Sequence, residues 1–375
     1  MNTPLEKPKP IFFFSLLIVG VIIASIMLLE LGLRITADRQ LRSMLTLARV
    51  MHYENRRGLV LTPNLEMKHE LPTGEAEYTI KINGQGLRQN QDVPLQKKAG
   101  QYRILVLGDS FTFGLGVNND ETYPAQLEKL LNGTNGGGKY EVINAGFAGG
   151  NCPLTHYLFL KDHGRQFSPD LVIEGFFAGN DLQDMRLYTE VRDENGLPIK
   201  ALAPGGDLWP WIKRTAIYQE LGLRKIYPLL AHKTANVGTA PDANGELRPA
   251  TGNNESAIPT TLTRAQELLL AMRDLLGKQG AQFKLVFIPA MESVFSGRDP
   301  ITDKVRAELA EFCLFSSINW LDLTPALRRG GPDCYFDEDR HFTIKGNRIA
   351  AEEMAKQVRS SSSINNRALS EETQK

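Results

Sequence analysis

Short apolar segments alternate with amphipathic stretches along most of the chain. Five segments rich in apolar residues are bounded by turn residues, at 104–107, 140–144, 169–177, 283–288 and 320–323. Continuous apolar runs of this length are typical of parallel strands that are buried on both faces of a sheet. Helical apolar spacing follows the strands, at 125–131, 263–277, 301–312 and 347–358. The pattern predicts an α/β domain over residues 100–358, built on a parallel sheet.

A longer apolar run lies near the N-terminus and does not fit this alternation. Residues 11–29 contain no charged side chain and are long enough to cross a bilayer core as a helix. No small-residue cleavage site follows, so we expect a retained signal anchor over 11–33, after a cytoplasmic N-terminus at 1–10. Basic residues stand on both sides of the run, so charge counting alone leaves its orientation open.

Three further segments lack the strand-and-helix rhythm of the core. Residues 34–99 predict a juxtamembrane stalk, helical and polar to about residue 60, followed by an added β ribbon in which Arg88 is expected to be exposed. Residues 193–260 predict an insert with a helix at 212–230, in which Trp209 and Trp211 either anchor the insert or stack on sugar rings. Residues 359–375 predict a disordered tail.

Charge and cysteine content exclude several classes of function. The 43 basic and 43 acidic residues balance, which argues against a nucleic-acid binder that works by bulk charge. The three cysteines are too few and too scattered for a disulfide scaffold or a zinc site. The acidic run 337–339 is better explained as a solvated loop than as a cation site. We therefore expect no metal, nucleotide or other cofactor.

Polar residues that could carry chemistry follow the apolar segments. Ser110 comes directly after the first strand, at the edge of the sheet where ligands bind, and is a candidate nucleophile. The side-chain amide of Asn180, after the third strand, could stabilise an oxyanion, although a helix cap is also possible there. In the loop before the last helix, Asp339 could hold the imidazole of His341 so that Nε2 accepts a proton from a serine.

Four motifs taken together resemble the SGNH hydrolases, also called the GDSL-like family. They are Gly-Asp-Ser at 108–110, Gly146 in Asn-Ala-Gly, Asn180 in Gly-Asn-Asp, and the Asp339/His341 pair. The resemblance covers about residues 100–190 and 260–358, and implies a flavodoxin-like, three-layer α/β/α fold. It also implies that Ser110 is the nucleophile and His341 the general base. The oxyanion hole would be the N–H of Ser110, the N–H of Gly146 and the amide of Asn180.

The third triad member has two candidates. The family often has the acid three places before the histidine, which would select Glu338, whereas a two-place spacing selects Asp339. We prefer Asp339, because the two-place spacing also occurs in relatives.

The anchor and the 82–88 element resemble membrane-anchored bacterial SGNH proteins, many of which are encoded near surface-polysaccharide genes. This resemblance implies a single-pass protein of the inner membrane with its domain in the periplasm or outside the cell. It also implies an acylated carbohydrate as substrate and exopolysaccharide machinery as a possible partner. Three functions remain open: a serine esterase that removes acetyl groups, an O-acetyltransferase with the same triad, and a non-catalytic glycan-binding domain.

Overall fold

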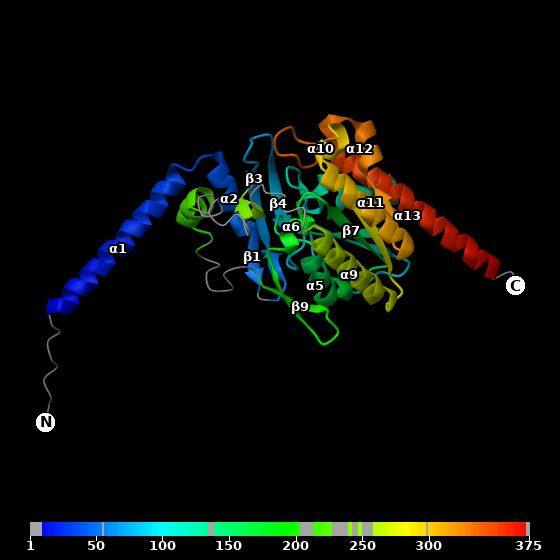
Figure 1. Ribbon diagram of the computed structural model, residues 1–375, viewed down its shortest axis with the longest axis horizontal. Coiled ribbons are helices and arrows are strands. Elements are labelled where there is room, and N and C mark those ends of the chain that lie inside the picture. The colour runs from blue at the N-terminus through cyan, green and yellow to red at the C-terminus, as the bar shows by residue number, and fades with distance from the viewer. Residues whose placement is uncertain are drawn as a thin grey trace, which may run out of the picture.

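Five parallel strands form the centre of the molecule (Figure 1). Their spatial order is β13–β12–β7–β5–β6, which in chain order of the five strands is the 2-1-3-4-5 arrangement of doubly wound, flavodoxin-like sheets. The predicted fold is therefore confirmed. The strands are β5 Tyr102–Gly108, β6 Tyr140–Gly146, β7 Leu171–Phe177, β12 Gln282–Ile288 and β13 Asn319–Asp322. The computed structural model describes residues 10–54, 56–133, 139–202, 212, 214–226, 239–241, 247–249, 258–297 and 299–372.

Both faces of the sheet are covered by helices, so successive strand residues enter different cores. On β5, Leu105 and Leu107 pack on one side, whereas Ile104 and Val106 pack on the other. This period-two division explains why apolar residues occur at successive positions in the strands instead of at alternate ones. The first core is completed by α5 Pro153–Asp162, α9 Ile258–Gly277 and α11 Pro300–Phe315. The second is completed by α4 Tyr123–Asn132, α12 Thr324–Gly330 and α13 Ile344–Glu372.

Short helical turns fill the connections around the sheet. Three of them follow β5, β7 and β12 at the carboxyl edge: α3 Ser110–Phe113, α6 Asp181–Met185 and α10 Met291–Phe295. The 3₁₀ turns are η1 Asn119–Glu121, η2 Gly164–Phe167 and η6 Pro332–Cys334. The three cysteines are buried and free.

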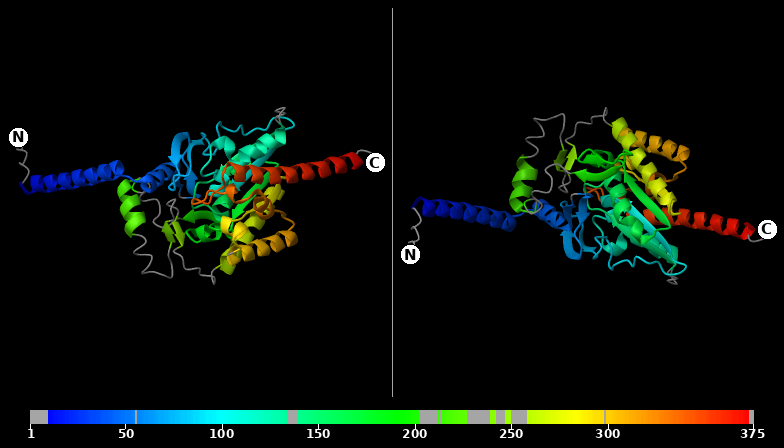
Figure 2. Two further views of the ribbon diagram at one scale, coloured as in Figure 1. Left: turned by 90° about the horizontal axis from the view of Figure 1, so that it is seen from above. Right: turned by 90° about the horizontal axis from the view of Figure 1, so that it is seen from below.

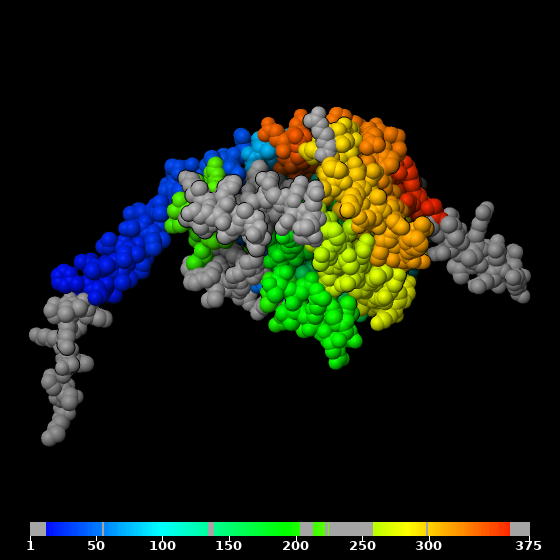
Figure 3. All heavy atoms as spheres, in the orientation of Figure 1, coloured from blue at the N-terminus to red at the C-terminus, as the bar shows by residue number. Residues whose placement is uncertain are grey.

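The N-terminal apolar run is a single helix, α1 Pro10–Ile35, that projects from the body of the molecule (Figures 2 and 3). Within Phe13–Ile35, an 18-residue stretch has a mean hydropathy of 2.7, and none of that stretch is buried against the rest of the chain. By length and composition this helix could cross a membrane.

The segment after α1 is more β-rich than the sequence indicated. Helix α2 Arg39–Val50 is followed by the hairpin β1 Met51–Glu54 and β2 Gly58–Leu61, where a helical stalk was predicted to continue. Cross-strand pairing of apolar and aromatic residues explains the difference, because Tyr53 lies opposite Leu59. The expected ribbon is β3 Leu65–Glu70 paired with β4 Glu77–Ile82.

Arg88, expected to be exposed, is buried, and that prediction was wrong. Its side chain donates to Asn119 Oδ1 at 2.6 Å and to the carbonyl of Val117 at 2.9 Å. Its guanidinium carbon lies 4.2 Å from the centre of the Phe113 ring, and burial lowers the pKa of Arg88 to about 10. Asn119 lies 31 residues after Arg88 in the chain, so no local sequence pattern reveals this contact.

The insert contacts the N-terminal helices. Its first strand, β9 Pro198–Leu202, pairs with β8 Thr189–Arg192, which precedes it, and it also contains the helical segment η4 Tyr218–Ile226 and the short pair β10 Thr239–Pro241 and β11 Leu247–Pro249. Glu30 of α1 accepts hydrogen bonds from the N–H groups of Ala216 and Ile217, at 2.9 and 3.0 Å. Trp209, Trp211 and residues 1–9 lie outside the described residues.

The C-terminal residues also depart from the expectation. Where the sequence predicted a disordered tail from residue 359, α13 continues to Glu372. Residues 347–372 contain no glycine or proline, so nothing in the sequence interrupts the helix.

Candidate active site

Ser110 lies where the central strand β5 turns into α3. The side chain of Asp109 caps this short helix by accepting the N–H of Phe111 at 3.0 Å. Gly108 has a φ of 154°, and a Cβ built there would lie 2.0 Å from Thr112 Oγ1. Glycine is therefore required at 108 for the strand to end so close to the helix that begins with Ser110.

The side chains of Ser110, His341 and Asp339, which come from opposite ends of the domain, lie in contact. His341 Nε2 lies 2.7 Å from Ser110 Oγ, and His341 Nδ1 lies 2.6 Å from Asp339 Oδ1. All three residues are buried. Of the two acidic candidates, Asp339 rather than Glu338 contacts the imidazole in this structure. With Nδ1–H donated to the carboxylate, Nε2 can accept the Ser110 proton.

The loop that carries Asp339 and His341 is closed by its own backbone. Tyr335 and Phe342 form an isolated β-bridge, and the N–H of Phe336 donates to the carbonyl of His341 at 2.9 Å. Arg340, between the two triad candidates, has a φ of 72°, which turns the chain sharply enough for the two-place spacing. The ring of Phe111 packs 4.8 Å from the imidazole and supports one side of it.

Gly146 ends the neighbouring strand β6, but its N–H points elsewhere than expected. It donates to Asn144 Oδ1 at 2.9 Å, so it is occupied and is not available to an oxyanion. Asn144 also donates its amide to the carbonyl of Thr112 at 3.0 Å, which ties β6 to α3. A Cβ at Gly146 would lie 2.3 Å from the backbone nitrogen of Phe113. Gly146 is therefore needed for close packing against α3.

Asn180, the predicted amide donor to an oxyanion, follows β7 directly before α6. It stands at the start of α6 without capping it, and its side chain is 1% exposed. Neither the amide nitrogen nor the amide oxygen has a hydrogen-bond partner among the described residues. A buried amide without a partner is costly, which is typical of a group kept for a ligand.

Buried acidic groups lie behind the site. Burial raises the pKa of Asp181 well above its usual range, and the nearby charges of Asp109 and Glu174 add to that effect. Glu174, in β7, pairs with His156 Nδ1 at 2.7 Å, and both side chains are fully buried. Among the described residues, no group of three or more His, Cys, Asp and Glu side chains is arranged to hold a metal ion.

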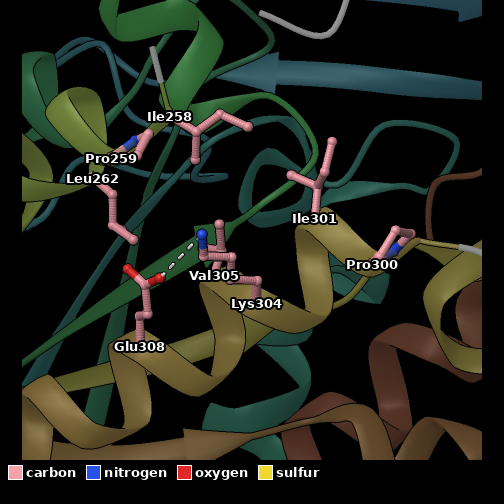
Figure 4. A pocket seen from close by; sticks show the side chains of 8 residues that line it. All are labelled: Ile258, Pro259, Leu262, Pro300, Ile301, Lys304, Val305 and Glu308. Atoms are coloured by element: carbon pink, nitrogen blue, oxygen red, sulfur yellow. Dashed lines mark ion pairs between the residues drawn. The ribbon is translucent and has the colours of Figure 1, made fainter. Parts of the chain in front are cut away.

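A separate apolar pocket of about 190 Å³ lies between the N-terminal parts of α9 and α11 (Figure 4). Its polar members, Lys304 and Glu308, form an ion pair with each other at 3.9 Å. Ser110, Asn180 and His341 do not line it. The pocket is therefore distinct from the candidate site.

The sequence was compared with models of known protein families. Residues 106–349 match the model of the GDSL-like Lipase/Acylhydrolase family. The chain belongs to this family. It is an SGNH hydrolase, an enzyme that acts on ester bonds, and the matched region contains every residue of the candidate site.

Solved structures similar to this GDSL-like hydrolase include three esterases or acylhydrolases. The acetyl xylan esterase AlAXEase is 17% identical, covering 68% of this chain and 99% of its own, with a TM-score of 0.41. A lipase/acylhydrolase from Enterococcus faecalis is 14% identical, covering 70% and 97%, with a TM-score of 0.40. The psychrotrophic esterase EstA from Pseudoalteromonas sp. is 12% identical, covering 69% and 98%, with a TM-score of 0.39. The search of curated proteins returned no match.

Proposed function

We propose that the protein is a membrane-anchored serine esterase that removes O-acetyl groups from a carbohydrate. The observation that carries this proposal is the continuous pair of contacts from Ser110 Oγ to His341 Nε2 and from His341 Nδ1 to Asp339 Oδ1, at 2.7 and 2.6 Å. That arrangement is the one needed to activate a serine hydroxyl at neutral pH.

The reaction has two steps. In the first, His341 Nε2 takes the proton of Ser110 Oγ as the oxygen attacks the ester carbonyl, and then returns it to the departing sugar hydroxyl. In the second, His341 takes a proton from water as the water oxygen attacks the acyl-serine, and returns it to Ser110 Oγ as acetic acid leaves and ionises to acetate. Asp339 holds the imidazole in the required tautomer and stabilises its positive charge.

The oxyanion would be bound by the N–H of Ser110 and the amide of Asn180. The Ser110 N–H is at the first position of α3, where a helix has no internal acceptor. Since Gly146 N–H is occupied, we assign the third donor to Gly149, which is buried in the following loop and whose N–H has no acceptor among the described residues. Each such donor is worth about 10²–10³-fold in kcat.

The burial of the nucleophile supports a short acyl group. Ser110 is 1% exposed and His341 is 3% exposed, so the acyl group has to reach a hydroxyl below the surface, and we propose acetyl as a group small enough to do so. The carbohydrate part of the proposal, and a link to exopolysaccharide machinery, rest on the sequence resemblance to membrane-anchored bacterial relatives.

The test uses the full-length enzyme in detergent. We expect hydrolysis of p-nitrophenyl acetate, a preference of at least about tenfold over the octanoate, and acetate release from acetylated polysaccharide. A fluorophosphonate should form one adduct, on Ser110, that is absent in Ser110→Ala and His341→Ala. A folded wild type that hydrolyses no ester and forms no adduct would refute the proposal. Transfer of acetyl to added glycan instead of water would identify a transferase.

The proposed location follows from α1. We infer that α1 crosses the inner membrane once, with residues 1–10 in the cytoplasm and the catalytic domain, residues 100–358, outside it. Protease added to spheroplasts should then digest the domain, while carbonate extraction leaves the protein in the membrane. Protection of the domain until the cells are lysed would place it on the cytoplasmic side.

A further inference from the structure

One side chain of the N-terminal ribbon reaches the loop that carries the triad carboxylate. Glu75, in the turn between β3 and β4, accepts the N–H of Glu338 on Oε1 at 3.0 Å and the N–H of Asp339 on Oε2 at 2.8 Å. These partners are 263 and 264 residues away along the chain. Burial raises the pKa of Glu75, but the N–H groups of Glu338 and Asp339 outweigh that effect and lower it overall.

The two N–H groups depend on this carboxylate. The bridge between Tyr335 and Phe342 and the bond from Arg340 N–H to the Phe336 carbonyl use other parts of the loop backbone. Within the described residues, the acceptors of the Glu338 and Asp339 N–H groups are the two oxygens of Glu75. Without Glu75, this part of the loop would have to turn its donors toward water.

Glu75 is itself held in place. The turn is closed by the N–H of Leu71, which donates to the Ala76 carbonyl at 2.9 Å, and by the N–H of Gly74, which donates to the Leu71 carbonyl at 2.9 Å. The hydroxyl of Thr73 donates to Glu75 Oε2 at 2.8 Å. The carboxylate is therefore presented from a closed turn rather than from a free loop.

The ribbon is also fixed to the nucleophile side of the site. The N–H groups of Thr79 and Lys81, both on β4, donate to the side chains of Asn118 and Asn119, at 3.0 and 3.2 Å. Just beyond the ribbon, Arg88 stacks on Phe113, the last residue of the helix that starts with Ser110. The ribbon thus contacts the loop of the acid through Glu75 and the segment that follows α3 through β4, and Arg88, just after the ribbon, contacts α3 itself.

We propose that Glu75 is a positioning residue for ester hydrolysis, which sets the place of Asp339 and through it the orientation of His341. This inference rests on the proposed function, because it assumes that Ser110, His341 and Asp339 are the catalytic residues. Glu75 does not touch the reacting atoms. Through Glu75, the N-terminal ribbon would help to position the catalytic residues.

The experiment compares two substitutions that each remove one negative charge from the ribbon. Glu75→Gln keeps the shape but leaves one of the two N–H groups facing an amide NH₂. Glu77→Gln is the matched control, because Glu77 is paired only with Lys68 at the surface, where its side chain is 62% exposed. Activity on p-nitrophenyl acetate, the rate of fluorophosphonate labelling and the melting temperature are measured on the full-length enzyme in detergent, together with Ser110→Ala.

We expect Glu75→Gln to lower kcat and the labelling rate by about tenfold, with KM within about twofold, because the acid is misplaced by a fraction of an ångström. Glu75→Ala, which removes both acceptors, should lower kcat by about 30–100-fold. Glu77→Gln should match the wild type in all three measurements. Both Glu75 variants should melt within about 5 °C of Glu77→Gln, since the ribbon's other contacts remain.

Two results would overturn the inference. One is a Glu75→Gln enzyme with the kcat and labelling rate of Glu77→Gln while Ser110→Ala is inactive. The other is a Glu75→Gln protein that melts more than about 5 °C below Glu77→Gln, which would make Glu75 a requirement of the fold. Failure of the proposed function itself is seen separately, as an unlabelled wild type or a Ser110→Ala variant of full activity.

Discussion

Asp339 Oδ1 lies 2.6 Å from His341 Nδ1, although only Arg340 separates the two residues in the chain. The positive φ of Arg340 turns the chain sharply between them, and Glu338 contributes only its backbone N–H, which Glu75 accepts. The relationship distinguishes two acidic residues that the sequence alone leaves as alternatives.

The first prediction concerns that choice. Asp339→Asn should lower kcat by about 10³–10⁴-fold, because the amide no longer selects the tautomer that leaves Nε2 free to accept a proton. Glu338→Gln should stay within about twofold of the wild type, since its backbone N–H, not its carboxylate, contacts Glu75. Initial rates on p-nitrophenyl acetate decide between them. A larger loss in Glu338→Gln than in Asp339→Asn would transfer the acid role to Glu338.

The second prediction concerns the oxyanion donor. Asn180→Ala should lower kcat by about 10²–10³-fold and leave KM nearly unchanged, because the amide binds charge that develops only in the transition state. Its melting temperature should not fall, since the amide has no hydrogen-bond partner among the residues that the structure describes. Steady-state kinetics and a thermal scan test both parts. A variant that is active but much less stable would show that Asn180 serves the fold instead.

The third prediction concerns the buried arginine beside α3. Arg88→Met should destabilise the protein by about 2–4 kcal/mol, because Asn119 Oδ1 and the Val117 carbonyl lose their donor in a buried site. The control is Arg348→Met, which removes an exposed ion pair with Glu352 and should cost less than about 1 kcal/mol. Urea unfolding measures both. Equal midpoints for the two variants would contradict the importance of this burial.

The fourth prediction concerns acid stability. Burial, and then the charge of Arg88, lower the pKa of His69 from 6.5 to about 4, against a smaller opposing effect of Asp339. Between pH 6.5 and 4 the unfolded chain binds a proton at His69 that the folded chain does not, so stability falls as the pH falls. The shift corresponds to about 3 kcal/mol over this range.

His69→Gln tests this linkage because it removes the titrating group. Its free energy of unfolding should fall less steeply than that of the wild type between pH 6.5 and 4, and the two slopes should agree above pH 7. Parallel curves across the whole range would show that other groups govern the acid lability.

The strands and the main helices were predictable because their signals are local. A strand covered by helices on both faces is buried and mostly apolar along its length, as β5 and β7 are, and each can be recognised without knowing its neighbours. The candidate site residues could also be identified from the sequence, because the carboxyl edge of a parallel sheet collects residues from the loops that follow the strands. They are Ser110, Asn180 and the Asp339/His341 pair.

The errors and omissions concern contacts between distant segments. Arg88 looked exposed because its acceptors lie around residues 117–119, and Glu75 gave no signal because its partners follow about 260 residues later. Gly146 was assigned an open N–H because the sequence does not reveal that Asn144, two residues earlier, folds back to accept it. In each case hydrogen-bond pairing, rather than hydrophobic patterning, decides the outcome.

The contact between Glu30 and the insert bears on how far the enzyme can reach. In a membrane-anchored enzyme, a loose tether would let the catalytic edge sweep through a volume set by tether length. Here the carboxylate of Glu30 holds the start of the insert's helical segment, and Asp38 holds Arg224 further along it at 2.7 Å. These contacts join α1 and the start of α2 to the insert, so α1 and the insert would move together, and α1 would not act as a loose tether.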